Sequence, residues 1–171
     1  SDVQFSNSAI IRYSQLFLVD NSITISCNRG TSGIDGSTST AIGAACASKN
    51  RTTLVTGDLS FFYDSNALWN SYIPNSFRII LVNNSGGGIF KIIPGPKQSN
   101  VLSYFETPHT LTAEYLCQMF GFEYFTATDN DTLDKGLAFF YEDVNAPRLL
   151  EIFTPSDQND LVLKAYIDHL K

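Results

Sequence analysis

The apolar run Ile79-Ile80-Leu81-Val82 most constrains what this chain can fold into. It lies within an expected strand from Phe77 to Val82, and its four consecutive apolar residues leave no polar side chain for solvent on either face. Strands of this kind are typical of parallel sheets, which helices cover on both faces. The run therefore predicts a central strand of an α/β sheet.

Strands and helices alternate along the rest of the chain. The expected strands cover 23–27, 54–56, 77–82, 124–126 and 148–153, and the expected helices cover 9–17, 37–47, 61–70, 113–120, 132–141 and a segment from about 157. This order predicts a doubly wound, mostly parallel sheet with helices on both faces. No repeat or change of composition marks a second domain. The stretch 83–112 exceeds the usual loop length, which favours a functional role.

Composition excludes several functions. The net charge of −6 argues against a nucleic-acid partner, because phosphate binding needs a basic surface. No apolar run approaches the ~20 residues of a membrane span. An odd number of cysteines, Cys27, Cys46 and Cys117, argues against a disulfide framework, and we expect Cys46 and Cys117 in the core. The chain is expected to be cytoplasmic.

Three polar loops follow three of the apolar runs. The first is the glycine-punctuated segment 28–36, the second is Gly57-Asp58-Leu59-Ser60, and the third is 83–88, which ends in three glycines. In doubly wound sheets ligands bind beyond the carboxyl ends of the strands, where these loops would meet. We therefore expect one shared binding site.

Two residues of these loops have the chemistry of a cation site. Asp58 and Asn84 each follow a strand, and with a backbone carbonyl of the glycine run they supply the oxygen donors that Mg²⁺ accepts beside a diphosphate. The loop N–H groups and the start of the helix after Asp58 would face the diphosphate. Each residue alone is also an ordinary turn residue. Neither G-x-x-x-x-G-K-[ST] nor G-x-G-x-x-G occurs.

These motifs resemble a known family. Gly57-Asp58, followed by Asn84, is similar to the thiamine-diphosphate motif, although Leu59 stands where most of that superfamily has glycine. Three segments resemble the 2-succinyl-5-enolpyruvyl-6-hydroxy-3-cyclohexene-1-carboxylate synthases of menaquinone biosynthesis: Gly57-Asp58-Leu59-Ser60, 27–36 and 83–90. The resemblance implies that 1–171 is the C-terminal diphosphate-binding domain of a larger enzyme, whose N-terminal domains lie outside this chain.

The resemblance also implies roles for individual residues. Asp58, Asn84 and the Gly86 carbonyl would bind Mg²⁺ or Mn²⁺, and Ser60 would lie beside the diphosphate. Ile34 would press the thiamine into its bent form, although it also suits ordinary core packing. The implied cofactor-binding set is Ser32, Gly33, Ile34, Gly57, Asp58, Leu59, Ser60, Asn84 and Gly86. The implied substrate-binding set is Ser8, Arg12 and Arg29 for carboxylates, with Ile89 and Phe90 as apolar walls.

The implied reaction is that of a transferase. Thiamine diphosphate would allow decarboxylation of 2-oxoglutarate and addition of the succinyl carbanion equivalent to isochorismate. The glutamate that this chemistry needs comes from the N-terminal domain of a partner subunit, which implies a homodimer or homotetramer. No catalytic residue is therefore assigned, and this chain alone should be inactive. Glu151 is expected at a surface or turn position, and His109 in solvent. An acetolactate-synthase-like carboligase or decarboxylase and a non-catalytic binding module remain alternatives.

Overall fold

The computed structural model describes residues 1–98, 100–143 and 145–170. Its strands form one six-stranded, all-parallel sheet in the order β2-β1-β3-β4-β6-β5. The strands are β1 (Asp2–Phe5), β2 (Thr24–Cys27), β3 (Thr52–Gly57), β4 (Arg78–Asn83), β5 (Glu123–Ala127) and β6 (Arg148–Phe153). The longer helices are α1 (Ala9–Ser14), α2 (Ser37–Ala47), α3 (Asp58–Tyr63), α6 (Glu114–Phe120), α7 (Asn130–Phe140) and α8 (Asn159–His169).

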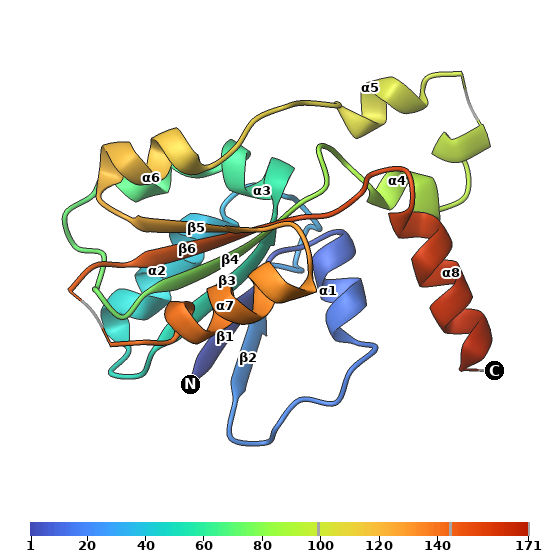
Figure 1. The fold of residues 1–171 in the computed structure, drawn as a ribbon. Coiled ribbons are helices and arrows are strands. Elements are labelled where there is room, and N and C mark those ends of the chain that lie inside the picture. The colour runs from blue at the N-terminus through green and yellow to red at the C-terminus, as the bar shows by residue number, and fades with distance from the viewer. Residues whose placement is uncertain (99, 144, 171) are drawn as a thin grey trace.

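Successive side chains of the central strands enter two separate apolar cores. Leu54, Ile79 and Leu149 pack in one cluster with buried residues of α2, α3 and α6. Ile80 and Leu150 point the other way and pack with α7. Figure 1 shows α3 and α6 on one side of the sheet and α1 and α7 on the other. The doubly wound α/β architecture expected from the apolar runs is confirmed, because helices cover both faces.

The strand order brings the predicted loops to one edge. Gly57 at the end of β3 pairs with Val82 near the end of β4, so the residues that follow both strands are neighbours. β1 lies on the other side of β3, and its loop leads into α1 at the same edge. The connection after β1 leads to β2, and the connection after β3 leads to β4, in the opposite direction along the sheet. This divergence creates the crevice where such folds bind ligands.

Several elements differ from the prediction. Strand β1 was not expected, because its alternation of polar and apolar residues extends over only four positions. The expected helix 61–70 is divided into α3 and the 3₁₀ turn η1 (Ser65–Trp69), and the expected helix 9–17 ends at Ser14. The long stretch 83–112 contains three short helical segments, α4 (Ile89–Ile92), η2 (Pro96–Gln98) and α5 (Leu102–Glu106). Residue 99 of that stretch lies outside the described residues.

The last helix stands apart from the sheet. None of the residues of α8 is buried, and Figure 1 shows it beside α1, away from the strands. Phe17, which follows α1, contacts Tyr166 of α8, with ring centroids 6.0 Å apart. Over the described ranges, no helix is long and apolar enough to cross a membrane.

Candidate functional site

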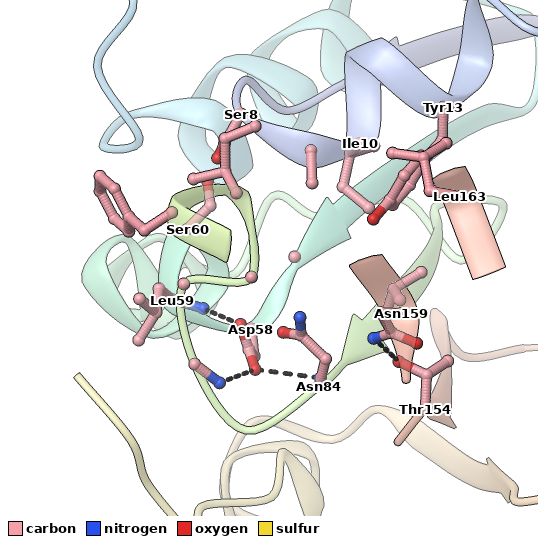
Figure 2. A pocket seen from close by; sticks show the side chains of 18 of the residues that line it. Ser8, Ile10, Tyr13, Asp58, Leu59, Ser60, Asn84, Thr154, Asn159 and Leu163 are labelled. Carbon is pink, nitrogen blue, oxygen red and sulfur yellow. Dashed lines mark hydrogen bonds between the residues drawn. The ribbon is translucent and has the colours of Figure 1, made fainter. Parts of the chain in front are cut away.

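A cavity of about 440 Å³ opens at the carboxyl ends of β1, β3 and β4. This volume lies in the range of small-molecule sites. Figure 2 shows its polar end, with Asp58 and Asn84, and its apolar end, where Ile10 and Tyr13 of α1 face Leu163 of α8. The cavity therefore joins the loops of the sheet edge to an apolar cleft between the first and last helices.

Asp58 organises the polar end. Its side chain is buried, with the residue 2% exposed, and it accepts three backbone hydrogen bonds. Oδ1 accepts from the N–H of Leu59 at 2.7 Å, and Oδ2 accepts from the N–H groups of Asn84 at 3.1 Å and Gly86 at 2.9 Å. Asp58 thus fastens the loop after β4 to the start of α3.

Three oxygen atoms gather here, one of them from this carboxylate. The side-chain Oδ1 of Asn84 lies 2.6 Å from the carbonyl oxygen of Gly86 and 3.3 Å from Oδ2 of Asp58. Without a cation, the amide gains by turning its nitrogen to this position, from which it donates to both oxygens. With a cation, the oxygen is the atom that must point inward.

The spacing of these atoms fits a small divalent cation. Octahedral Mg²⁺ holds its ligands at about 2.0–2.1 Å, which puts neighbouring oxygens about 3 Å apart. The two distances at Asn84 Oδ1 bracket that value. A carboxylate, an amide oxygen and a carbonyl are also the ligand types that Mg²⁺ prefers. The donor set thus suits Mg²⁺ in both chemistry and spacing.

The loop after β4 needs its glycines. Gly86 has φ +150°, and a Cβ there would lie 2.7 Å from the carbonyl oxygen of Glu106. A Cβ at Gly88 would collide with the Asn84 amide. The N–H of Gly87 donates to the Glu106 carbonyl at 2.7 Å, and the Glu106 side chain pairs with Lys91 at 3.0 Å. The loop is therefore held against α5, with no room for a side chain at Gly86, whereas one at Gly88 would displace the Asn84 amide.

A buried carboxylate supports the other side of this loop, and here the expectation for Glu151 was wrong. Glu151 is 0% exposed and accepts from Asn83 Nδ2 at 2.6 Å, the N–H of Ala113 at 3.0 Å and the Tyr124 hydroxyl at 2.6 Å. Burial, the hydrogen bond to Glu151 and its charge raise the pKa of Tyr124. Asn83 Nδ2 also donates to the Leu111 carbonyl at 2.9 Å. Glu151 thus joins β6 to the ends of the segment that contains His109.

His109 was also placed wrongly by the sequence. Its side chain is 10% exposed, and Nε2 lies 3.2 Å from Asp58 Oδ2. The residue therefore packs against Asp58, a residue of the cavity wall, instead of facing solvent.

Residues of the first polar loop divide between the cavity and its rim. Ile34 lines the cavity, and its carbonyl accepts from the Ser60 hydroxyl at 2.5 Å. Ser60, Gly57 and Leu59 line the cavity as well. Ser32 and Gly33 do not line it, and the Gly33 carbonyl instead accepts from Asn7 Nδ2 at 3.3 Å. Only Ile34 of the three loop residues expected at the cofactor reaches the cavity wall.

The residues expected to bind substrate lie in two groups. Ser8, Ile89 and Phe90 line the cavity. Arg12 and Arg29 do not, but each is anchored to a residue that does. Arg12 Nη1 donates to the Ser8 carbonyl at 3.0 Å, and Arg29 Nη1 donates to Asn7 Oδ1 at 3.2 Å. Both guanidinium groups are therefore tied to the loop between β1 and α1, at the cavity rim.

Sequence reasoning missed several lining residues. Asn7 is 5% exposed and holds both Arg29 and the Gly33 carbonyl; its place beside Ser8, an expected substrate-binding residue, was a usable signal. Other missed residues come from α1 and the turn after it, from the position after β6 and from α8, and no local motif marks them: Tyr13, Leu16, Phe17, Thr154, Asn159, Val162, Leu163 and Tyr166.

The fold and this cavity define a doubly wound α/β domain with a candidate cation site at the carboxyl edge of its sheet. No family model matches the chain. Its curated relatives are synthases named 2-succinyl-5-enolpyruvyl-6-hydroxy-3-cyclohexene-1-carboxylate synthase. Those of Flavobacterium johnsoniae, Christiangramia forsetii and Bacteroides fragilis are 56%, 55% and 41% identical to it over 99%, 100% and 99% of its length.

These matches confirm the resemblance, because nearly the whole chain is similar to one part of these synthases. It spans 31%, 30% and 31% of the length of the three relatives. The chain therefore corresponds to about a third of such a synthase.

Proposed function

We propose that residues 1–171 are the C-terminal domain of such a synthase and hold the Mg²⁺–diphosphate end of thiamine diphosphate. The observation that supports this most directly is the meeting of Asp58 Oδ2, Asn84 Oδ1 and the Gly86 carbonyl beside the cavity. An anionic oxygen and two neutral oxygens suit a divalent cation that also binds phosphate oxygens.

In this proposal the chain binds and orients the cofactor. Asp58, Asn84 and Gly86 hold Mg²⁺ or Mn²⁺, and Ile34 and Leu59 supply apolar contact from the cavity wall. When bound, thiamine diphosphate supplies the carbon nucleophile that decarboxylation of a 2-oxo acid requires. The buried network of Asp58 keeps the loop after β4 in one arrangement, so little reorganisation is needed when the cation arrives.

The two arginines at the rim favour substrates with carboxylates. A guanidinium donates two parallel hydrogen bonds to a carboxylate, and Arg12 and Arg29 are anchored at the cavity by Ser8 and Asn7. Together with Ile89 and Phe90 as apolar walls, they suit 2-oxoglutarate and isochorismate. The whole enzyme would then join decarboxylation to carboligation.

The rest of the active site is proposed to come from other parts of the protein. Large side chains such as Phe17, Trp69 and Tyr72 are 64%, 72% and 80% exposed, which is costly unless another surface covers them. We expect N-terminal domains, and a partner subunit in a homodimer or homotetramer, to cover such residues. The glutamate that assists the cofactor would lie there.

The test uses the full-length protein that contains this chain. Thiamine diphosphate and Mg²⁺ together should raise its melting temperature, and either alone should raise it less, because only the ternary complex stabilises the native state fully. It should release CO₂ from 2-oxoglutarate in the presence of isochorismate. Preference for pyruvate would indicate an acetolactate-synthase-like enzyme, and no ligand-dependent stabilisation would indicate a non-catalytic module.

The chain by itself should release no CO₂ from 2-oxoglutarate, since half of the cofactor's surroundings would be missing. Release above a control without enzyme would contradict the division of the site between domains.

A further inference from the structure

His109 contacts the proposed metal ligand from the side of the long segment between α5 and α6. Its Nε2 lies 3.2 Å from Oδ2 of Asp58, the oxygen that also accepts from the backbone of Asn84 and Gly86. Nε2 is fully buried and makes no well-aligned hydrogen bond to any described residue. A buried ring nitrogen in this position needs either the carboxylate or a bound ligand as its partner.

The protonation of the ring follows from its other nitrogen. Nδ1 accepts a hydrogen bond from the backbone N–H of Leu111 at 3.1 Å. An accepting nitrogen carries no proton, so the neutral ring has its proton on Nε2, which lies 3.2 Å from Asp58 Oδ2. His109 therefore presents a donor to the carboxylate.

The ring has little freedom to turn away. The imidazole and the Phe62 ring form a T-shaped pair, with ring centroids 5.5 Å apart and an angle of 86° between the ring planes. The backbone N–H of His109 donates to the Ser85 carbonyl at 3.2 Å, next to Asn84. Asn83 and Glu151 hold Leu111 and Ala113 on the far side of the same segment. The ring contact and these three backbone anchors thus hold the imidazole beside the carboxylate.

We infer that His109 is a positioning residue that holds the Asp58 carboxylate in the orientation required for the divalent cation. This inference rests on the proposed function, since it takes Asp58 as a metal ligand. Hydrogen bonds from an outer group to a ligating carboxylate orient the ligand, and their loss typically weakens metal binding about 10–100-fold. The ring touches neither substrate nor cofactor in this role.

Two variants separate the functions of the two ring nitrogens. His109→Gln keeps a donor amide at about the reach of Nε2 and loses the acceptor for Leu111. His109→Asn keeps an acceptor near Nδ1 but is too short to donate to Asp58. Phe62→Leu is the matched control, because it removes the ring contact of His109 and leaves both nitrogens in place.

The measurement is a Mg²⁺ titration of the full-length protein at saturating thiamine diphosphate, with cofactor binding followed by equilibrium dialysis. The Mg²⁺ concentration at half-saturation should rise about 10–100-fold in His109→Asn and less than about 3-fold in His109→Gln and Phe62→Leu. Melting temperatures without ligand, and far-UV circular dichroism, establish that each variant folds.

A purely structural role predicts another pattern. His109→Asn and His109→Gln would then shift the half-saturation point equally, or only the melting temperature would fall, and either result overturns the inference. If the unchanged protein binds thiamine diphosphate without any need for Mg²⁺, the proposed function fails and this inference with it. Mg²⁺-dependent binding in the unchanged protein that His109→Asn leaves intact refutes the role of His109 alone.

Discussion

Asp58 is expected to serve both folding and metal binding, and two substitutions should separate these roles. Asp58→Ala removes the acceptor of three backbone N–H groups, one of which, on Gly86, is buried. Each bond to a charged group contributes about 1.5–3 kcal/mol, and water from the cavity can replace part of it. We therefore expect a loss of about 3 kcal/mol, or about 6–12 °C in melting temperature for a domain of this size.

Asp58→Asn should cost less stability. Its amide oxygen can still accept from Asn84 and Gly86, and only the bond to Leu59 is lost, which corresponds to about 1 kcal/mol and about 2–4 °C. The negative charge beside the cation is lost completely. The Mg²⁺ concentration at half-saturation should then rise by more than about 100-fold, beyond the effect of outer groups.

The assay is a melting curve of the full-length protein without ligand, beside a Mg²⁺ titration with thiamine diphosphate. Asp131→Asn, which removes an exposed charge at the start of α7, is the control and should change neither value. If Asp58→Asn binds Mg²⁺ like the unchanged protein, the metal assignment is wrong. If Asp58→Ala melts at the unchanged temperature, the three backbone bonds do not support the fold.

Three further predictions concern the surroundings of the site. Gly86→Ala should abolish Mg²⁺-dependent cofactor binding in equilibrium dialysis, whereas Gly95→Ala, also at positive φ (+103°) but with nothing within 4 Å of its Cβ, should not. Glu151→Gln should lower the melting temperature by about 4–8 °C, since its amide nitrogen must face one of three donors, and Tyr124→Phe should lower it less. Burial raises the pKa of Cys117 from 9.0 to about 12. Its thiol should therefore resist alkylation at pH 8 while the exposed Cys46 reacts, as mass spectrometry would detect. Because the pKa of Cys117 is higher in the native state than in the unfolded state, its contribution to stability is full below pH 9 and is lost as pH rises from 9 toward 12.

Local patterns were sufficient for most of the sheet. The run at 79–82 and the alternation of strands with helices predicted the parallel core, since burial on both faces favours runs of apolar residues. Strand β1 escaped notice because it is short and its pairing with β2 and β3 lies in residues far along the chain. Cys46 was expected in the core but is exposed, because the small residues of α2 give the helix no distinct apolar face.

The sequence by itself determined the loops of the site: the motifs at Asp58, at 83–88 and at 28–36 follow strands, and parallel strands end at one edge. Only the tertiary structure decided what surrounds them. His109 contacts Asp58, which lies 51 positions earlier in the chain. Glu151 accepts a hydrogen bond from Ala113, which lies 38 positions earlier in the chain, in the segment that carries His109. Helix α8 closes one wall of the cavity, although its own residues are all unburied. Motifs record short-range requirements of the backbone, whereas these contacts depend on which distant segments the packed sheet brings together.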